Sequence, residues 1–276
     1  MNLLSIALAV LFSVDAAGSK PSGRVGGPEA GAGGSGGAAA APAEPAPLPA
    51  VLAHVDELHR RRDDRAAWAE EQRLMQGALA RAPGDYGVLW RAARVYFWLS
   101  DDPGLGNEQR SKLGKEGWDL AQRAIAANPN DVAGHYFAAV CMGNYALGLG
   151  IMRALSQGLE GKFRDQLGQA ERLNLQYESG AIDTAWGRFY EKLPWPKRDR
   201  KKAEEHLRRA IQIAPANLRA RVYLAETLLN DDRPQEAKRL LDEVEAAPPG
   251  HGDAPEERRA KALAVGLQPQ VSARLK

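Results

Sequence analysis

The sequence of 276 residues contains only one cysteine, Cys141. A single cysteine cannot form a disulfide within the chain, so the fold must be held together by packing alone. We interpret Cys141 as a small apolar residue in a helix interface. Long apolar runs are also scarce. The run at residues 3–14 is about 12 residues long, shorter than the roughly 20 residues that a membrane-spanning helix needs.

The sequence also has no large excess of either charge. Its 37 lysines and arginines nearly balance 35 aspartates and glutamates, which gives a net charge of +2. The basic runs at residues 59–62 and 197–202 are interleaved with acids or lie beside acidic segments, which is typical of a solvated face. A nucleic-acid-binding domain needs a strongly basic surface, so we expect no nucleic-acid partner.

Catalytic motifs are missing too. No two of the five histidines flank a glutamate at the spacing of a zinc protease. The sequence has no phosphate-binding loop, no dinucleotide fingerprint and no nucleophile elbow. Carboxylate pairs such as Asp63 and Asp64 suit turns and helix caps better than acid–base catalysis. We therefore expect a protein that is not an enzyme and has no catalytic residue, cofactor or metal site.

The apolar run at residues 3–14 is followed by the small residues Ala16, Ala17 and Gly18. This pattern resembles a secretory signal, although no lysine or arginine precedes the run. The sequence predicts a signal peptide at residues 1–17 and export to the periplasm or cell envelope. An uncleaved membrane anchor and a misassigned start are the alternatives. The alanine-, arginine- and glycine-rich composition suits a GC-rich bacterial genome.

Residues 18–50 are rich in glycine, alanine and proline, with few charges and no aromatic residue. Such a segment buries too little apolar surface to offset its loss of conformational entropy on folding. We expect a disordered linker over residues 18–50, which becomes stiffer where proline replaces glycine. If the signal segment is kept, this linker would tether the folded part to the membrane.

The sequence does contain a repeated helical segment that ends in proline. The copies end at Pro83, Pro129, Pro215 and Pro248, and a further copy has Leu175 in the same position. Proline cannot continue a helix, because it lacks an N–H and clashes with the preceding turn. The copies are 46, 46, 40 and 33 residues apart. The last spacing is close to the tetratricopeptide period of about 34 residues, so the longer spacings predict insertions.

These repeats predict an all-α fold, a tetratricopeptide-like solenoid of helical hairpins with insertions over residues 51–267. We expect a first helix at residues 51–82, with a charged run in its middle that favours a break. A last helix at residues 256–265 would cap the exposed end of the solenoid, as terminal repeats must. A flexible tail is expected at residues 268–276.

The clearest copy spans residues 218–247. Its second helix carries Ala237, Leu241 and Val244 at spacings of four and three, which is the apolar stripe of an amphipathic helix. The turn at residues 230–234 ends in a proline that can begin this helix. The small alanine allows the paired helices to approach closely.

Two segments depart from a plain repeat. Residues 143–155 are apolar and rich in glycine, which indicates close helix approach, a kink, or backbone that lies beside a ligand. Residues 192–197 place Trp195 between two prolines, where a helix cannot continue. Trp195 either packs back onto its hairpin or lines a partner surface. The resulting candidate partner or ligand surface consists of His135, Tyr145, Met152, Trp186, Tyr190 and Trp195.

Residues 187–190, 193–196, 203–215 and 218–244, with the glycine-rich residues 143–158, resemble the T-component of tripartite ATP-independent periplasmic (TRAP) transporters. The resemblance implies a periplasmic helical protein with a central pore or groove. It also implies a solute-binding protein as partner, a small hydrophobic ligand and a homo-oligomer. The chain differs from a typical T-component in lacking an obvious lipidation cysteine and in carrying the long linker.

A second, more distant similarity is to the regulator of microtubule dynamics family. It involves residues 89–92, residues 121–129 with the following His135, and residues 170–174. Both resemblances agree with a helical repeat protein.

The repeats and the missing catalytic motifs lead to one main expectation about function. We expect a non-enzymatic, exported scaffold that binds a protein partner through the concave face of its helical repeats. The alternative is a periplasmic carrier of a small hydrophobic ligand, with an apolar pocket near residues 143–155 and 186–195.

Overall fold

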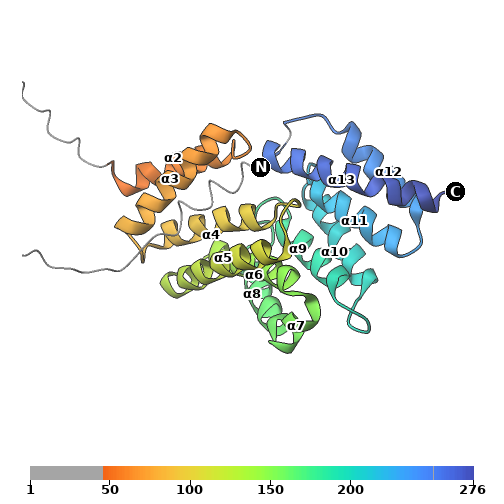
Figure 1. Ribbon diagram of the computed structural model, residues 1–276, viewed down its shortest axis with the longest axis horizontal. Helices are drawn as coiled ribbons and strands as arrows, with labels where there is room; N and C mark the ends of the chain where they lie inside the picture. The colour runs from red at the N-terminus through yellow and green to blue at the C-terminus, as the bar shows by residue number, and fades with distance from the viewer. Residues whose placement is uncertain (1–45, 251) are drawn as a thin grey trace, which may run out of the picture. The chain divides into compact units, whose positions relative to one another are not determined.

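The computed structural model describes residues 46–250 and 252–276, and its regular elements are all helices (Figure 1). The signal peptide expected at residues 1–17 and the linker up to residue 45 lie outside the described residues. The described helices are α2 (Leu48–His59), α3 (Arg65–Arg81), α4 (Tyr86–Ser100), α5 (Asn107–Ala127), α6 (Val132–Leu149), α7 (Ile151–Ser156), α8 (Leu159–Leu173), α9 (Ala181–Lys192), α10 (Arg200–Ile213), α11 (Leu218–Asn230), α12 (Pro234–Ala246) and α13 (Ala254–Arg274).

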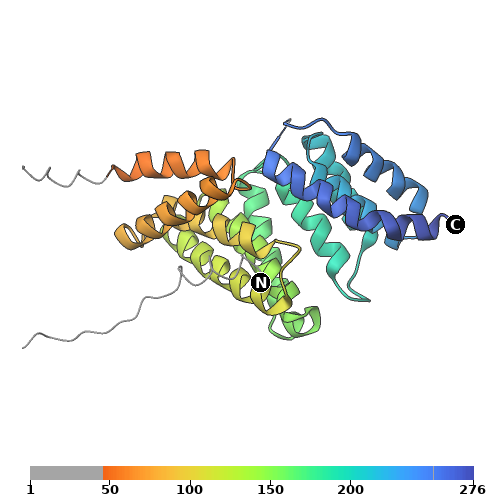
Figure 2. The ribbon, with the colours of Figure 1, turned by 45° about the horizontal axis from the view of Figure 1, so that its top comes forward.

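The helices pair into five hairpins, α2–α3, α4–α5, α6–α8, α9–α10 and α11–α12. The hairpins stack in chain order, since α3 packs on α4, α5 on α6, α8 on α9 and α10 on α11. The short α7 is inserted between α6 and α8, and α13 packs on both α11 and α12. Figures 1 and 2 show this succession from the orange α2 to the blue α13. The predicted all-α, tetratricopeptide-like solenoid with insertions is confirmed.

The repeated proline frame marks the end of the second helix in every hairpin. Helices α3, α5, α8, α10 and α12 each end two residues before the frame position, which is Pro83, Pro129, Leu175, Pro215 or Pro248. In the first four of these helices, the residue just before the frame position still donates its N–H to the carbonyl four residues earlier. The frame residue therefore stands where the helical hydrogen bonds stop, and Leu175 shows that proline is not required for this.

The ends of the described domain differ from the expected ends. Helix α2 begins at Leu48, three residues before the expected start. The charged run does break the first helix, because the Asp64 side chain caps α3. The tail expected at residues 268–276 is wrong, since α13 continues to Arg274. Val271 is buried in the cluster formed by α10 to α13, and this burial stabilises the extra turns.

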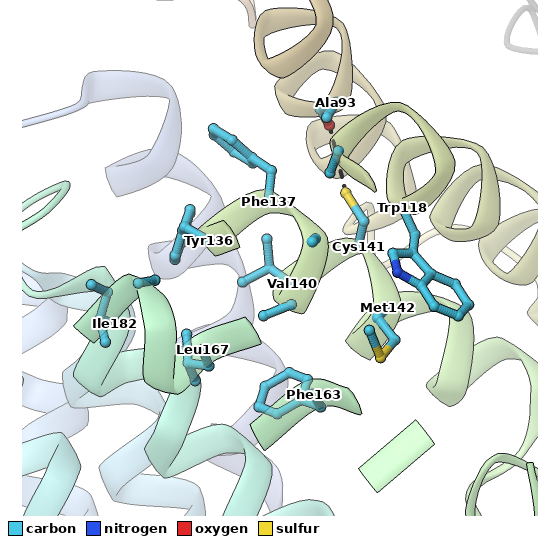
Figure 3. Close-up of a cluster of buried hydrophobic side chains, with 14 of the residues drawn as sticks. Ala93, Trp118, Tyr136, Phe137, Val140, Cys141, Met142, Phe163, Leu167 and Ile182 are labelled. Atoms are coloured by element: carbon cyan, nitrogen blue, oxygen red, sulfur yellow. Dashed lines mark hydrogen bonds between the residues drawn. The ribbon is translucent and has the colours of Figure 1, made fainter. Parts of the chain in front are cut away.

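Helix α6 lies at the centre of the largest apolar cluster. All its residues from Ala133 to Met142 are buried, as expected of a helix with neighbours on every side. In Figure 3, Cys141 points towards Ala93 of α4, while Phe163 and Leu167 of α8 lie on another side of α6. The Cys141 thiol is fully buried and lies 3.6 Å from the Ala93 carbonyl oxygen. Cys141 is thus an interface residue, as the sequence predicted.

Glycines let α5 and α6 come into backbone contact. A methyl group on Gly114 would lie 2.5 Å from the Tyr145 amide nitrogen, and one on Gly148 would lie 2.5 Å from the Asn107 carbonyl oxygen. Both distances are too short for a real side chain. Gly150 has a φ of +94° and separates α6 from α7. The glycine-rich segment therefore provides both the close approach and the break that its composition indicated.

We predict that Gly148→Ala destabilises the fold. The added methyl group meets backbone atoms of α5, which cannot rotate away, so the two helices must separate. Overpacking of this kind lowers the free energy of unfolding by about 1–3 kcal/mol. Urea unfolding followed by circular dichroism measures the change.

Gly77→Ala is the matched control, because nothing lies within 4 Å of the added methyl group in α3. Alanine there should stabilise the protein by about 0.5–1 kcal/mol. Equal effects of the two substitutions would contradict the close packing of α5 on α6.

Candidate binding cavity

The first helix of each hairpin carries a second stripe of side chains in addition to the one that packs on its partner. On α4 and its C-cap this stripe is Trp90, Arg94, Phe97 and Asp101, at spacings of four, three and four residues. Such spacings place all four side chains on one helical face. The stripe faces away from α5 and contributes to a cavity on the inner side of the solenoid.

The cavity has a volume of about 750 Å³. Its walls come from α2, α4, α6, α9, α11 and the N-terminal end of α13, with α7 and α8 closing one end. The apolar part of the lining includes Trp90, Phe97, Tyr136, Phe137, Val140, Leu155, Phe163, Phe189, Leu193 and Tyr223. The charged part includes Asp56, Arg60, Arg62, Arg94, Asp101, Glu160, Glu178, Arg188, Lys192, Arg219, Asp253, Glu256 and Glu257.

Stacked aromatic rings form one wall of the cavity. The Trp90 and Phe137 rings are nearly parallel, with centroids 6.1 Å apart, and Phe97 tilts against Phe137 at 6.2 Å. Tyr136 packs edge-on against Phe137 at 5.1 Å. Trp90 and Phe97 are only partly buried, so this wall offers a rigid apolar surface to an occupant.

Ion pairs join the two ends of the helical array around the cavity. Arg62, in the α2–α3 turn, donates to Asp253 at 2.6 Å, although 191 positions separate them in the sequence. Arg258 of α13 pairs with Asp63 of the same turn. Arg259 stacks on the Trp98 ring, with its guanidinium carbon 3.2 Å from the ring centroid. These contacts bring the first and last helices together beside the cavity.

The loop between α8 and α9 brings a carboxylate to the cavity wall. Glu178, Ser179 and Gly180 have φ values of +47°, +55° and +79°, a left-handed conformation that is unfavourable for residues other than glycine. Within the described residues, the Glu178 side chain has no hydrogen-bond or ion-pair partner. The Glu178 side chain is exposed to solvent. The surrounding protein nevertheless reduces the hydration of its carboxylate and raises the pKa of Glu178, against the attraction of Arg94 and Arg62.

A buried charge network supports the cavity beneath α2 and α4. Arg94 lies 2.9 Å from Asp56 and 3.8 Å from Glu71, and the His59 Nδ1 lies 2.8 Å from Glu71. Burial favours the neutral form of Asp56, but Arg91 and Arg94 outweigh it and lower the Asp56 pKa. Burial raises the pKa of Glu71 to about 7, against the pull of Arg94. Burial and nearby arginines hold the His59 pKa far below its usual range, so this imidazole is neutral.

None of the six residues selected from the sequence lines this cavity. Trp186 is buried, and its indole N–H donates to Glu171 at 3.0 Å. Tyr190 stacks on Trp186 and accepts a hydrogen bond from Arg164 at 3.2 Å. Both rings lie on the face of α9 towards α8 and α10, whereas Phe189 and Lys192 on another face of the same helix line the cavity.

Two more of the selected residues have structural contacts. His135 is buried, where its Nδ1 lies 2.7 Å from Gln166 and its Nε2 donates to the Pro129 carbonyl at 2.9 Å. His135 thus packs in a helix interface and does not line the cavity. Tyr145 packs on Trp118 of α5, with ring centroids 6.0 Å apart.

Met152 and Trp195 are exposed by 72% and 87% of their surface. Trp195 therefore does not pack back onto its hairpin, which was one of its two interpretations. Both side chains lie outside the cavity, although neighbouring residues of each segment line it, such as Ile151 and Leu155 or Phe189 and Leu193.

The sequence patterns did not single out Trp90, Arg94, Phe97 or Glu178 as lining residues of the cavity. A signal for the first three was present as a second stripe at helical spacing on an amphipathic helix. The position of Glu178 had no such signal, because it depends on the left-handed backbone between α8 and α9.

Among residues 46–250 and 252–276, no group of three or more histidine, cysteine or acidic side chains is arranged to hold a metal ion. In the same part of the chain, no helix is both long enough and apolar enough to cross a membrane.

Comparison with known proteins agrees with this architecture. The family model described as regulator of microtubule dynamics protein 1-3 matches residues 51–180, and a tetratricopeptide-repeat model matches residues 197–263. No curated protein matches the sequence. These matches support the second resemblance noted in the sequence. They give no support to the TRAP T-component resemblance, which stays a prediction.

Two solved structures align with most of the chain. A thermophilic TPR protein of Thermus thermophilus, TTC0263, aligns with a TM-score of 0.59 and 21% identity, over 79% of this chain and 99% of that chain. The MamA protein aligns with a TM-score of 0.42 and 14% identity, over 78% and 96%. The first likeness shows the tetratricopeptide-like fold. Such repeats generally mediate protein–protein interactions and are generally non-catalytic.

We predict that Glu71 makes the stability of the protein depend on pH. The folded carboxyl keeps its proton up to about pH 7, whereas its reference value is 4.5. Raising the pH through this window therefore favours the unfolded state, by up to roughly 3 kcal/mol at about 1.4 kcal/mol per pKa unit. Urea unfolding should show that the stability of the wild type falls relative to Glu71→Gln between about pH 5 and about pH 8.

Glu70→Gln is the control, because Glu70 lies on the same helix but is paired at the surface with Arg73. Relative to this variant, the wild type should show no comparable fall over the same pH range. Parallel pH profiles for the wild type and Glu71→Gln would show that Glu71 is ionised throughout.

Proposed function

We propose that this protein is a non-enzymatic scaffold, whose inner cavity binds an extended segment of a partner protein. The observation that carries this proposal is the cavity of about 750 Å³, to which the first helix of every hairpin contributes. Solenoid repeats commonly use such concave surfaces for binding. The occupant would have apolar side chains and at least one positively charged side chain.

The apolar requirement follows from the aromatic wall. Trp90, Phe97 and Phe137 hold one another in place through ring contacts, so they need not be ordered when a partner binds. A preformed surface loses little entropy on binding, which favours affinity. Aromatic anchors of this kind dominate the binding energy of many interfaces.

The positive charge follows from Glu178. Its neighbour Tyr177 packs on Tyr136 of the cavity wall with ring centroids 5.2 Å apart, so a carboxylate and aromatic faces lie close together. A lysine or arginine side chain interacts favourably with both groups. The other acids of the wall already have partners, such as Asp101 with Arg219 at 2.6 Å and Asp253 with Arg62 at 2.6 Å.

A carrier of a small hydrophobic ligand is the second candidate. The specific observation in its favour is the cavity volume of about 750 Å³, since ligand pockets measure roughly 300–1,000 Å³. Native mass spectrometry of protein purified from its own host separates the candidates. A bound small molecule that Ala185→Trp excludes from the cavity would favour the carrier.

We also propose that the protein acts outside the cytoplasm, in the periplasm or cell envelope. The support is the apolar run at residues 3–14 with the small residues that follow it. Cell fractionation with intact-mass measurement tests the proposal. A mass that lacks about the first 17 residues would indicate a cleaved signal, and full-length protein confined to the cytoplasm would contradict export.

We predict that Glu178 selects partners by charge. Random peptides displayed on phage and selected on the full-length protein should combine apolar residues with lysine or arginine. Glu178→Lys should weaken the binding of such a peptide about tenfold or more, because like charges then meet in the cavity. Fluorescence anisotropy with a labelled peptide measures the affinity.

Glu205→Lys is the matched control, because Glu205 is exposed on α10, outside the cavity. It makes the same charge change and should leave the peptide affinity within about twofold. An equal loss in both variants would point to long-range charge effects. A selection that yields no basic peptides would contradict the assigned role of Glu178.

A further inference from the structure

The two most exposed large apolar side chains of the described residues are Met152 and Trp195. Met152 lies on α7, and Trp195 lies in the loop between α9 and α10. Figures 1 and 2 both show α7 and this loop side by side at the lower edge of the helical array. We refer to Met152 and Trp195, together with the basic residues Arg153, Arg198 and Lys201, as the lower edge.

The loop that carries Trp195 is well anchored. Lys197 pairs with Glu160 at the start of α8, which ties the loop to the helix that follows α7. The Arg198 side chain donates to the Leu193 carbonyl at 3.0 Å, and the Asp199 N–H donates to the Tyr190 carbonyl at 3.3 Å. The loop therefore has a defined position, and the Trp195 ring stays exposed because no side chain of its own hairpin covers it.

The lower edge carries basic side chains without acidic partners. Residues 192–202 contain six lysines and arginines but only one acid, Asp199. Four of these six bases pair with acids: Lys192 with Glu226, Lys197 with Glu160, Arg200 with Glu191 and Lys202 with Asp199. Lys201 has no ion-pair partner among the described residues, and Arg198 bonds only to backbone there. Arg153, next to Met152, likewise forms no ion pair in the described part of the chain. The rest of the sequence has a small net negative charge, since residues 192–202 contribute +5 to a total of +2.

We propose that the lower edge docks on the surface of an anionic lipid membrane. A tryptophan side chain favours the interface between lipid headgroups and hydrocarbon, and lysines and arginines beside it are attracted to anionic lipids. Two apolar side chains that are exposed on a short helix and on a loop can enter such an interface without a complementary pocket. The inference is independent of what the cavity binds, because neither Met152 nor Trp195 lines it.

The test uses the full-length protein with vesicles of phosphatidylcholine alone, or of phosphatidylcholine with phosphatidylglycerol. Sedimentation should show binding to the anionic vesicles only. Brominated lipid should quench part of the tryptophan fluorescence of the wild type and less of that of Trp195→Phe. This difference reports on residue 195, so binding through any other segment does not produce it.

The double substitution Arg198→Glu with Lys201→Glu should lower the partition onto anionic vesicles about tenfold or more. Arg65→Glu with Arg239→Glu is the matched control, because both residues are exposed on α3 and α12, away from the lower edge. It makes the same change in net charge and should have little effect. All these positions are exposed at the surface, and circular dichroism confirms that each variant folds.

Three results would each overturn the proposal. The first is no binding to anionic vesicles, which would leave an acidic protein surface as the partner of the lower edge. The second is equal binding to both kinds of vesicle. The third is equal quenching in the wild type and Trp195→Phe, which would show that Trp195 does not enter the lipid.

Discussion

The close approach of α5 to α6 is the contact on which the rest of the structure depends. Gly114 and Gly148 bring the two backbones into contact at two points, so α6 can be buried on nearly all sides. Because α6 is held in this way, its Phe137 and Val140 side chains form fixed parts of the cavity wall. A looser α5–α6 pair would leave both the central core and the binding surface undefined.

The cavity combines two kinds of surface that arise from different causes. Its aromatic wall is a by-product of helix periodicity, since each inner helix needs one stripe for its partner and presents a second to the centre. Its charges are mostly neutralised by one another, often between opposite ends of the array, as with Arg62 and Asp253. Among the described residues, Arg60 and Glu178 are the charged lining side chains with neither an ion-pair nor a hydrogen-bond partner, and a left-handed backbone holds Glu178 in the cavity. Such a conformation persists only when the surrounding structure enforces it.

The six residues that the sequence placed on one candidate surface do not form a single surface in the structure. Trp186 and Tyr190 fill the space between α8, α9 and α10, whereas Met152 and Trp195 project into solvent. Trp186 and Tyr190 are thus packing residues, whereas Trp195, close to them in sequence, is exposed to solvent. Residue type alone did not distinguish a buried position from an exposed binding position, because large apolar side chains are common at both.

The sequence by itself determined the repeat architecture. Proline stops a helix for covalent reasons, and the stripe of Ala237, Leu241 and Val244 needs only the helical period to be recognised. The glycine-rich residues 143–155 indicated a close approach, a kink or backbone beside a ligand, and the structure shows the first two. Only the tertiary structure decided which face of each inner helix looks into the cavity, since this depends on how successive hairpins rotate against each other. The same holds for Glu178 and for the contact of α13 with the α2–α3 turn, because these groups meet only after the whole chain has folded.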